Sequence, residues 1–197
     1  MNEALVSGRK CSDAKAEYFP LAKAPYVTDD LTGTNASLNT WERGQRQFGW
    51  RRDGGKRAHA GCDLYGTEGD PIFAIKAGVV TRSKDRFHSG TGVVEIDHGD
   101  YTIRYGEIKV GNRLVEEGDH VKAGQKIAKV GKCDGVNNPM LHFEQYDNTL
   151  GGDLSNVKNA TFKHSNGLPY YRRLDLINPA ELLNTLFKKP LPKEAKI

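Results

Sequence analysis

The sequence has few cysteines, and the three that it has form no recognisable framework. Cys11, Cys62 and Cys133 are an odd number among 197 residues, and no pair has the CxxC spacing. Neither a set of structural disulfides nor a zinc knuckle held by thiolates is therefore indicated. One disulfide with a free thiol and three free thiols both agree with the sequence, so the redox compartment stays open.

Long hydrophobic runs are absent as well. No stretch approaches the 18 or so apolar residues that indicate a transmembrane helix, and residues 1–18 lack the apolar centre and cleavage site of a signal peptide. We therefore expect a soluble chain without a membrane span. Such a chain either leaves the cell by a route other than a signal peptide or has lost a leader by truncation.

An excess of one charge is nearly absent too. The 29 basic and 25 acidic residues give a formal net charge of +4, and part of the excess lies in a C-terminal tail that contains Lys188, Lys189, Lys193 and Lys196. No basic stripe with interleaved aromatic residues accompanies this charge, so we do not expect nucleic acid as a partner. An anionic polymer stays open as a partner.

Glycine, by contrast, is abundant and scattered. The 22 glycines form neither a G-X-Y period nor a low-complexity block, and they suggest many turns between short strands. Short apolar or alternating runs recur between these turns, at Pro71–Val80, Gly92–Asp97, Tyr101–Tyr105, His120–Gly131 and Met140–Tyr146. The pattern predicts an all-β fold, either an antiparallel sandwich or a partly open barrel.

The chain length and the positions of these runs predict one domain with extended ends. Residues 1–47 are expected to form an N-terminal arm or wrap, and residues 48–150 the β core. Residues 151–197 are expected to form a polar loop and a C-terminal helix that close the same domain. The polar stretch Gly151–Gly167 is either a mobile insertion or a substrate-binding loop.

The predicted helix lies near the C-terminus. Asn178 is the expected N-cap, with Pro179 at the first helical position. Leu182, Leu183 and Leu186 then share one face, which we expect to pack against the sheet.

Two segments hold candidate metal ligands. His59 and Asp63 are four residues apart, and a straight strand would separate them by about 13 Å, too far for ligands of one ion. The segment must therefore bend if both bind one ion, and Gly61 permits a bend. Taken alone, such a pair is common among surface and hydrogen-bonding residues. The pair by itself therefore does not decide between metal ligands and ordinary polar residues.

His142 belongs to the second segment. Strand alternation places Met140, His142 and Glu144 on one face and the two intervening apolar residues on the other, which we expect to be the packed face. Two imidazoles and one carboxylate leave one coordination position open, which is the pattern of a catalytic zinc site.

The order of these motifs resembles the lysostaphin or LytM-type zinc endopeptidases of peptidoglycan. The resemblance covers about residues 48–146 and is carried by Phe48–Arg51, His59–Leu64, Ala77–Val80, Val94–Gly99, Val121–Ile127, Val130–Gly131 and Leu141–Glu144. It is specific because both ligand motifs occur at the expected separation, with V-x-x-G-Q-x-I between them. It implies a LytM-type fold, zinc as the cofactor, and His59, Asp63 and His142 as the zinc ligands.

Two residues depart from the family pattern. The family has a histidine in its Y-x-H segment and another as the first histidine of H-x-H, and here these positions are Glu107 and Met140. A carboxylate can take a proton from the attacking water, as it does in the H-E-x-x-H peptidases, so we predict Glu107 as the catalytic base. The alternative for Glu107 is a salt bridge with Arg104, Arg113 or a lysine.

Met140 cannot transfer protons. It either makes one wall of the site apolar, which would raise the pKa of Glu107 or accept an apolar part of the substrate, or it only packs within its strand. The candidate zinc ligands are retained, which random decay of an inactive enzyme would not favour. The segments R-Y-G-E and M-L-H-F-E, with the closing R-R-x-D-L-x-x-P, also resemble one branch of the family, so we interpret the two changes as a coupled variant.

The remaining histidines have no partner motif. We expect His88, His98, His120 and His164 to be surface or turn residues.

Three arginines, Arg51, Arg52 and Arg57, crowd the approach to the first ligand segment, and one of them is a candidate for polarising the scissile carbonyl. Cys62 is expected to be buried and Cys133 to lie near the site.

The resemblance implies a zinc-dependent endopeptidase that hydrolyses peptide bonds in peptidoglycan stem or cross-bridge peptides, in the periplasm or at the cell wall. The expected partners are peptidoglycan and a cognate inhibitor or delivery machinery, as for an antibacterial effector or a phage lysin, and we expect a monomer. One alternative is a zinc-bearing but inactive wall-binding module or regulator of a wall amidase. Another is a glucose-specific sugar-phosphotransfer carrier, in which the histidine is phosphorylated.

Overall fold

The computed structural model describes residues 16–25, 40–156, 158, 160–189 and 191. The strands are β1 Arg51–Arg52, β2 Arg57–Ala58, β3 Cys62–Tyr65, β4 Pro71–Phe73, β5 Gly78–Lys84, β6 Gly92–Asp97, β7 Thr102–Ile108, β8 His120–Val121, β9 Lys126–Lys129, β10 Met140–Tyr146 and β11 Leu176–Ile177. The helices are the short 3-10 turns η2 Thr40–Glu42, η3 Gly44–Arg46 and η4 Asp53–Gly55, and the α-helix α1 Ala180–Phe187. No helix within the described ranges is long and apolar enough to cross a membrane.

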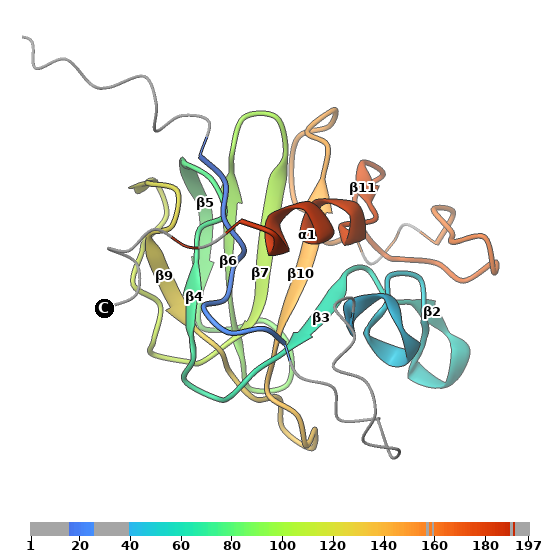
Figure 1. The fold of residues 1–197 in the computed structure, drawn as a ribbon. Helices are drawn as coiled ribbons and strands as arrows, with labels where there is room; N and C mark the ends of the chain where they lie inside the picture. Colours follow the sequence, from blue (N-terminus) through green and yellow to red (C-terminus); the bar gives the residue numbers. More distant parts are fainter. Residues whose placement is uncertain (1–15, 26–39, 157, 159, 190, 192–197) are drawn as a thin grey trace, which may run out of the picture.

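One antiparallel sheet dominates the molecule. Its strand order is β11-β10-β7-β6-β5-β8, and β3 also pairs with β10. Two smaller antiparallel pairs, β4 with β9 and β1 with β2, lie beside it (Figure 1). The predicted all-β antiparallel fold with a C-terminal helix is therefore confirmed.

The two faces of the main sheet differ because side chains alternate along each strand. Leu141 and Phe143 of β10 belong to the main apolar core, together with Ile103 and Tyr105 of β7. The opposite face of the same strands carries charged and polar side chains. The predicted separation of the two faces of β10 is therefore correct.

Helix α1 covers the apolar face of the sheet (Figure 1). Leu183 and Leu186 are fully buried in the main core, and Leu182 is partly buried against it. The helix begins one residue later than predicted, with Pro179 rather than Asn178 as its N-cap. The Asn178 side chain still accepts a hydrogen bond from the backbone N–H of Ala180 at 3.1 Å, which supports the first turn.

Two of the predicted runs are each divided into two strands. Pro71–Val80 becomes β4 and β5, and His120–Gly131 becomes β8 and β9. In the second run the chain turns where the Gln125 N–H donates to the Lys122 carbonyl at 3.1 Å, and Gly124 adopts a φ of +74°. A positive φ favours glycine, so this turn interrupts a run that is otherwise suited to a strand.

The described part of the N-terminal region packs on the β core. Phe19 and Leu21 are buried, and the Phe73 N–H donates to the Pro20 carbonyl at 2.9 Å. Trp41 is fully buried against Phe19 and Phe187 of α1. Residues 1–15 and 26–39, with Cys11 among them, lie outside the described residues, so the predicted domain boundaries stay a prediction.

A second, smaller apolar cluster lies on the outward face of β10. It consists of Ala58, Ala60, Tyr146, Leu154, Tyr170 and Leu176. Leu154 is buried and anchors the polar stretch Gly151–Gly167, and most of the described residues of this stretch are exposed. The segment after β10 therefore folds back over the charged face of the sheet.

His98 lies in the turn between β6 and β7, one of the two places predicted for it, but its side chain is buried rather than at the surface. Only 6% of its surface is exposed. Its Nδ1 lies 3.1 Å from the Ala77 carbonyl and its Nε2 lies 3.3 Å from the Tyr105 hydroxyl, which itself accepts a hydrogen bond from the backbone N–H of Ile75. A ring with a proton on Nδ1 alone satisfies all of these contacts. His120 and His88 are exposed as expected.

The buried His98 ring makes stability depend on pH. Burial lowers its pKa to about 4, although the hydrogen bond to Ala77 favours the charged ring. In the unfolded chain its pKa is about 6.5, so between these values only the unfolded state binds the proton, and the free energy of unfolding falls as pH falls from about 6.5 to 4.

We expect this effect to cost about 2 to 3 kcal/mol between pH 7 and pH 4.5. Urea unfolding of the metal-free chain at both pH values should therefore show a smaller pH dependence for His98→Asn than for the wild type. Equal pH dependence of the two chains would mean that His98 is not the responsible group.

Candidate metal centre

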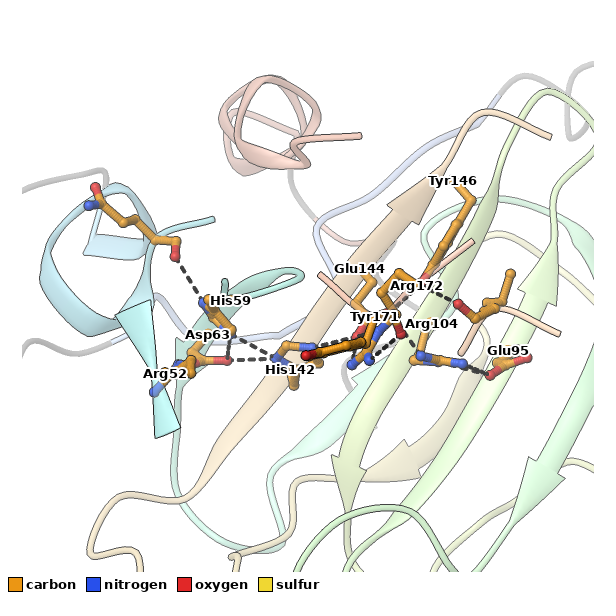
Figure 2. Close-up of polar contacts among 12 residues, drawn as sticks. Arg52, His59, Asp63, Glu95, Arg104, His142, Glu144, Tyr146, Tyr171 and Arg172 are labelled. Carbon is orange, nitrogen blue, oxygen red and sulfur yellow. Dashed lines mark hydrogen bonds and ion pairs between the residues drawn. The ribbon is translucent and has the colours of Figure 1, made fainter. Parts of the chain in front are cut away.

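Three predicted ligands meet where β3 pairs with β10. Asp63 lies directly opposite His142 in this ladder, and His59 approaches from the segment before β3 (Figure 2). Each of the three residues is at most 7% exposed. Among the described residues they form a group whose ligand atoms could hold one metal ion.

The ligand atoms form a nearly equilateral triangle. His59 Nε2 lies 3.1 Å from Asp63 Oδ1 and 3.1 Å from His142 Nδ1, and His142 Nδ1 lies 2.9 Å from Asp63 Oδ1. Ligands bound tetrahedrally about 2.0 Å from zinc lie about 3.3 Å from one another. The donor set and its spacing therefore fit a zinc ion with one coordination position left open.

The outer ring nitrogens of both histidines have partners. His59 Nδ1 lies 2.9 Å from the Gln47 carbonyl, and His142 Nε2 lies 2.8 Å from Glu144 Oε1. Both partners are acceptors, so each ring places a proton on its outer nitrogen and directs the other nitrogen to the centre of the triangle. Partners of this kind fix the tautomer and orientation of metal-binding histidines.

The first ligand segment bends at Gly61 as predicted. Glycine is needed there because there is no space for a side chain, rather than for its backbone freedom. Its φ is not positive, but a Cβ atom at this position would lie 2.4 Å from the Phe143 carbonyl oxygen. Only glycine lets the bend approach β10 this closely, which brings His59 back toward Asp63.

The three side chains of the triangle shift one another's pKa values. Burial alone would raise the pKa of Asp63, but the two histidines outweigh burial and hold it well below its usual range. Burial lowers the pKa of His59. Burial also disfavours a charged His142 ring, yet hydrogen bonds to Asp63 and Glu144 raise its pKa to about 9. Asp63 is held as an anion, which is the form that binds a cation.

Of the three arginines predicted near this segment, Arg52 contacts the centre. It forms an ion pair with the second carboxylate oxygen of Asp63, the one that faces away from the histidines (Figure 2). Arg57 pairs with Asp53 instead. Arg52 therefore leaves Asp63 one oxygen for a metal ion.

Glu107 lies beside the triangle because β7 contains a bulge. Its neighbour Gly106 is opposite His142, and the pairing of β7 with β6 slips between Gly92 and Val93, which leaves Glu107 as the extra residue. Glu107 adopts a φ of +58°. A bulge of this kind re-aims a side chain, here one that regular alternation after Tyr105 would direct into the apolar core.

The surroundings of Glu107 favour its protonated form. Burial raises its pKa to about 7, and the negative charge of Asp63 adds to the effect, while His142 and a hydrogen bond with the Cys133 thiol oppose it. Arg104 and Arg113, the expected salt-bridge partners, pair with other carboxylates. Cys133 thus lies near the site as expected, and both Cys62 and Cys133 are buried free thiols.

Comparison with known proteins agrees with this geometry. The model of peptidase family M23 matches residues 57–153. Lipoprotein NlpD of Yersinia enterocolitica is 37% identical over 83 residues, which are 42% of this chain and 82% of that relative. The chain belongs to peptidase family M23.

Other M23 relatives are larger. The peptidoglycan DD-endopeptidase ShyC of Vibrio cholerae is 35% identical over 88 residues, 45% of this chain but only 20% of the relative, so this chain spans about one fifth of its length. Among solved structures, the antimicrobial peptidase lysostaphin from Staphylococcus simulans has a TM-score of 0.55 at 21% identity, covering 81% of this chain and 56% of that chain. That likeness shows the shared fold.

Met140 is the residue predicted above to replace a family histidine. It is 7% exposed, lies opposite Tyr65 of β3 and forms an isolated bridge with Gly131. An apolar residue therefore lies two positions from the candidate ligand His142, on the same face of β10.

Sequence reasoning missed the residues that support His142. Glu144 could have been found, because it shares a strand face with His142 two residues away. Arg104 and Arg172, which bind Glu144, come from β7 and from the segment after residue 153, and no local pattern connects them with β10. Phe87, whose ring lies 6.4 Å from the His142 ring, also gave no signal.

Proposed function

We propose that this protein is a zinc-dependent endopeptidase that hydrolyses peptide bonds in the stem or cross-bridge peptides of peptidoglycan. His59, Asp63 and His142 would hold the zinc ion, and Glu107 would act as the base. The observation that carries the proposal is the triangle of three donor atoms 2.9 to 3.1 Å apart, with the outer nitrogen of each histidine already bound to an acceptor.

A zinc ion bound at these residues would supply Lewis acidity to a carbonyl oxygen and to an attacking water. The protein's own groups supply the rest. Arg52 holds Asp63 in place. Burial raises the pKa of Glu107 to about 7, so its carboxylate can take a proton from water and return it to the leaving amine. Phe87 and Met140 leave the surroundings of His142 partly apolar, which strengthens electrostatic interactions there.

The substrate and the place of action are inferred from the relatives. ShyC and ShyA of Vibrio cholerae are named as peptidoglycan DD-endopeptidases. Other relatives are named as lipoproteins, and one from Salmonella typhimurium as a murein hydrolase activator. We therefore propose that the protein acts on peptidoglycan in the periplasm or at the cell wall, with an inhibitor or delivery machinery as a further partner.

A second function is favoured by specific observations. NlpD from Salmonella typhimurium, named as a murein hydrolase activator, is 32% identical over 119 residues, and Met140 cannot transfer protons. A zinc-bearing but inactive wall-binding module or regulator of a wall amidase would have these features. It would bind cell-wall sacculi without releasing peptides.

The two functions are separated by incubating the zinc-loaded chain with purified peptidoglycan and analysing soluble peptides by mass spectrometry. The endopeptidase is expected to release new peptide termini, and a chelator should stop the release. Binding to sacculi without release, at saturating zinc, would support the regulator. A chain that binds neither zinc nor sacculi would contradict both.

A further inference from the structure

A buried carboxylate, Glu144, holds the outer nitrogen of the candidate ligand His142. Glu144 is fully buried, and both of its oxygens accept several hydrogen bonds. Oε2 accepts from Arg104 Nη1 at 2.9 Å and from the Tyr146 hydroxyl. Oε1 accepts from His142 Nε2 at 2.8 Å and from Arg172 Nη2 at 2.8 Å.

The two oxygens of Glu144 accept hydrogen bonds mainly from different parts of the chain. Arg104 and Tyr146 lie within the main sheet and hold Oε2. The oxygen that contacts His142 is instead held by Arg172, whose Nε also lies 3.0 Å from Oε1 and 3.1 Å from Oε2. Without Arg172, Oε1 would accept a hydrogen bond from His142 alone among the side chains of the described residues, and the carboxylate could rotate about its last bond.

Charge is balanced along this row of side chains. Arg104 also binds Glu95 at 2.7 Å, so two buried carboxylates face two guanidinium groups (Figure 2). Removing Arg172 would leave one negative charge without compensation beside His142. Buried charges that lose a partner reorganise or draw in water, because an unpaired charge in the interior is costly.

Arg172 is held in place by its own segment. Arg172 forms an isolated bridge with Ser155, and the Arg173 N–H donates to the Leu154 carbonyl at 2.9 Å. Leu154 and Tyr170 belong to the apolar cluster on the outward face of β10. The M23 match ends at residue 153, so Arg172 comes from a part of the chain outside it.

We propose that Arg172 is a positioning residue for the metal centre. It fixes Glu144, which in turn holds the His142 ring with its proton on Nε2 and with Nδ1 directed at the triangle. The affinity for zinc therefore depends on the segment that follows the matched domain. This inference rests on the proposed zinc site, and it concerns how the chain prepares the site rather than the reaction.

The test is zinc affinity, measured by competition with a chromophoric chelator for the wild type, Arg172→Ala and Arg173→Ala. Loss of the group that holds a metal-binding histidine typically weakens metal binding by about 10- to 100-fold. Arg172 acts through that group, Glu144, so we expect the lower end of this range, about 10-fold, for Arg172→Ala. Arg173 is the matched control, because it makes a comparable ion pair with Asp175 and does not contact Glu144. Arg173→Ala should lower the melting temperature while the zinc affinity stays within about threefold of the wild type.

A second measurement reports on the ring itself. One-bond proton–nitrogen NMR spectra of the zinc-loaded wild type should show a protected Nε2 proton on His142, and this proton should exchange faster with solvent in Arg172→Ala. If Arg172→Ala does not fold, Arg172→Lys can be tested instead. Lysine keeps the positive charge but cannot make the bidentate contact with Glu144, so we expect an intermediate loss of zinc affinity.

Three results would overturn the proposal. They are unchanged zinc affinity in the folded Arg172 variant, an equal loss in Arg173→Ala, and an unchanged exchange rate of the His142 proton. A wild-type chain that does not bind zinc would instead overturn the proposed function, and the inference with it. If only the role of Arg172 is wrong, the wild type still binds zinc tightly, which distinguishes this outcome from failure of the proposed function.

Discussion

Replacement of Glu107 by glutamine is expected to slow peptide release from peptidoglycan by about 10²- to 10⁴-fold, the usual contribution of a positioned general base. Glutamine keeps the length of the side chain and can occupy the same bulge, but it cannot accept a proton. Glu107 is not one of the three donors of the triangle, so the variant should still bind one zinc ion per chain.

The measurement is the rate of peptide release by the wild type, Glu107→Gln and a control, Glu68→Gln. Glu68 lies on the surface, where it pairs with Lys109 at 2.9 Å, and its replacement should leave the rate unchanged. Equal rates for Glu107→Gln and the wild type would remove Glu107 from the mechanism. Absence of release by every chain would favour the wall-binding module or regulator.

Replacement of His142 by alanine is expected to abolish stoichiometric zinc binding and to lower peptide release by more than about 10³-fold, since the metal contributes several kcal/mol to such reactions. The variant loses one of three donors and leaves Glu144 without the ring that it orients. Removal of zinc from the wild type by a chelator should have the same effect on activity, and added zinc should restore it.

Metal analysis and peptide release should be compared with those of His120→Ala. His120 is an exposed histidine of β8, away from the triangle, and its replacement should retain both zinc and activity. Zinc that stays bound to His142→Ala at one ion per chain would contradict the proposed ligand set. Full activity in a zinc-free chain would contradict the metallopeptidase itself.

Much of the candidate site could be predicted from local patterns. The alternation in β10 correctly separates His142 and Glu144 from Leu141 and Phe143, because a strand repeats every two residues whatever surrounds it. The need for a bend at Gly61 followed from the reach of a straight strand. That His59, Asp63 and His142 bind zinc, and that Glu107 is the base, stay predictions.

Other features could not be seen locally. Regular alternation from Tyr105 would send Glu107 into the core, but the bulge against β6 changes its orientation, and its pKa responds to the charges of Asp63 and His142. His98 was expected at the surface or in a turn; it lies in the β6–β7 turn, but Ala77 and Tyr105 hold its ring in the interior. In both cases the position of a side chain depends on a neighbouring strand that is distant in sequence.

The sequence by itself determined the all-β fold, the C-terminal helix and the residue types of the metal centre, because strand period, capping residues and ligand chemistry are local properties. The tertiary structure alone decided which of these residues meet. His59 and His142 are 83 positions apart, and they come within 3.1 Å because β3 pairs with β10 in one register. Folding also brings Arg172 to Glu144, because the segment after residue 153 lies over the charged face of the sheet and adds a second guanidinium beside a carboxylate that Arg104 of β7 already binds.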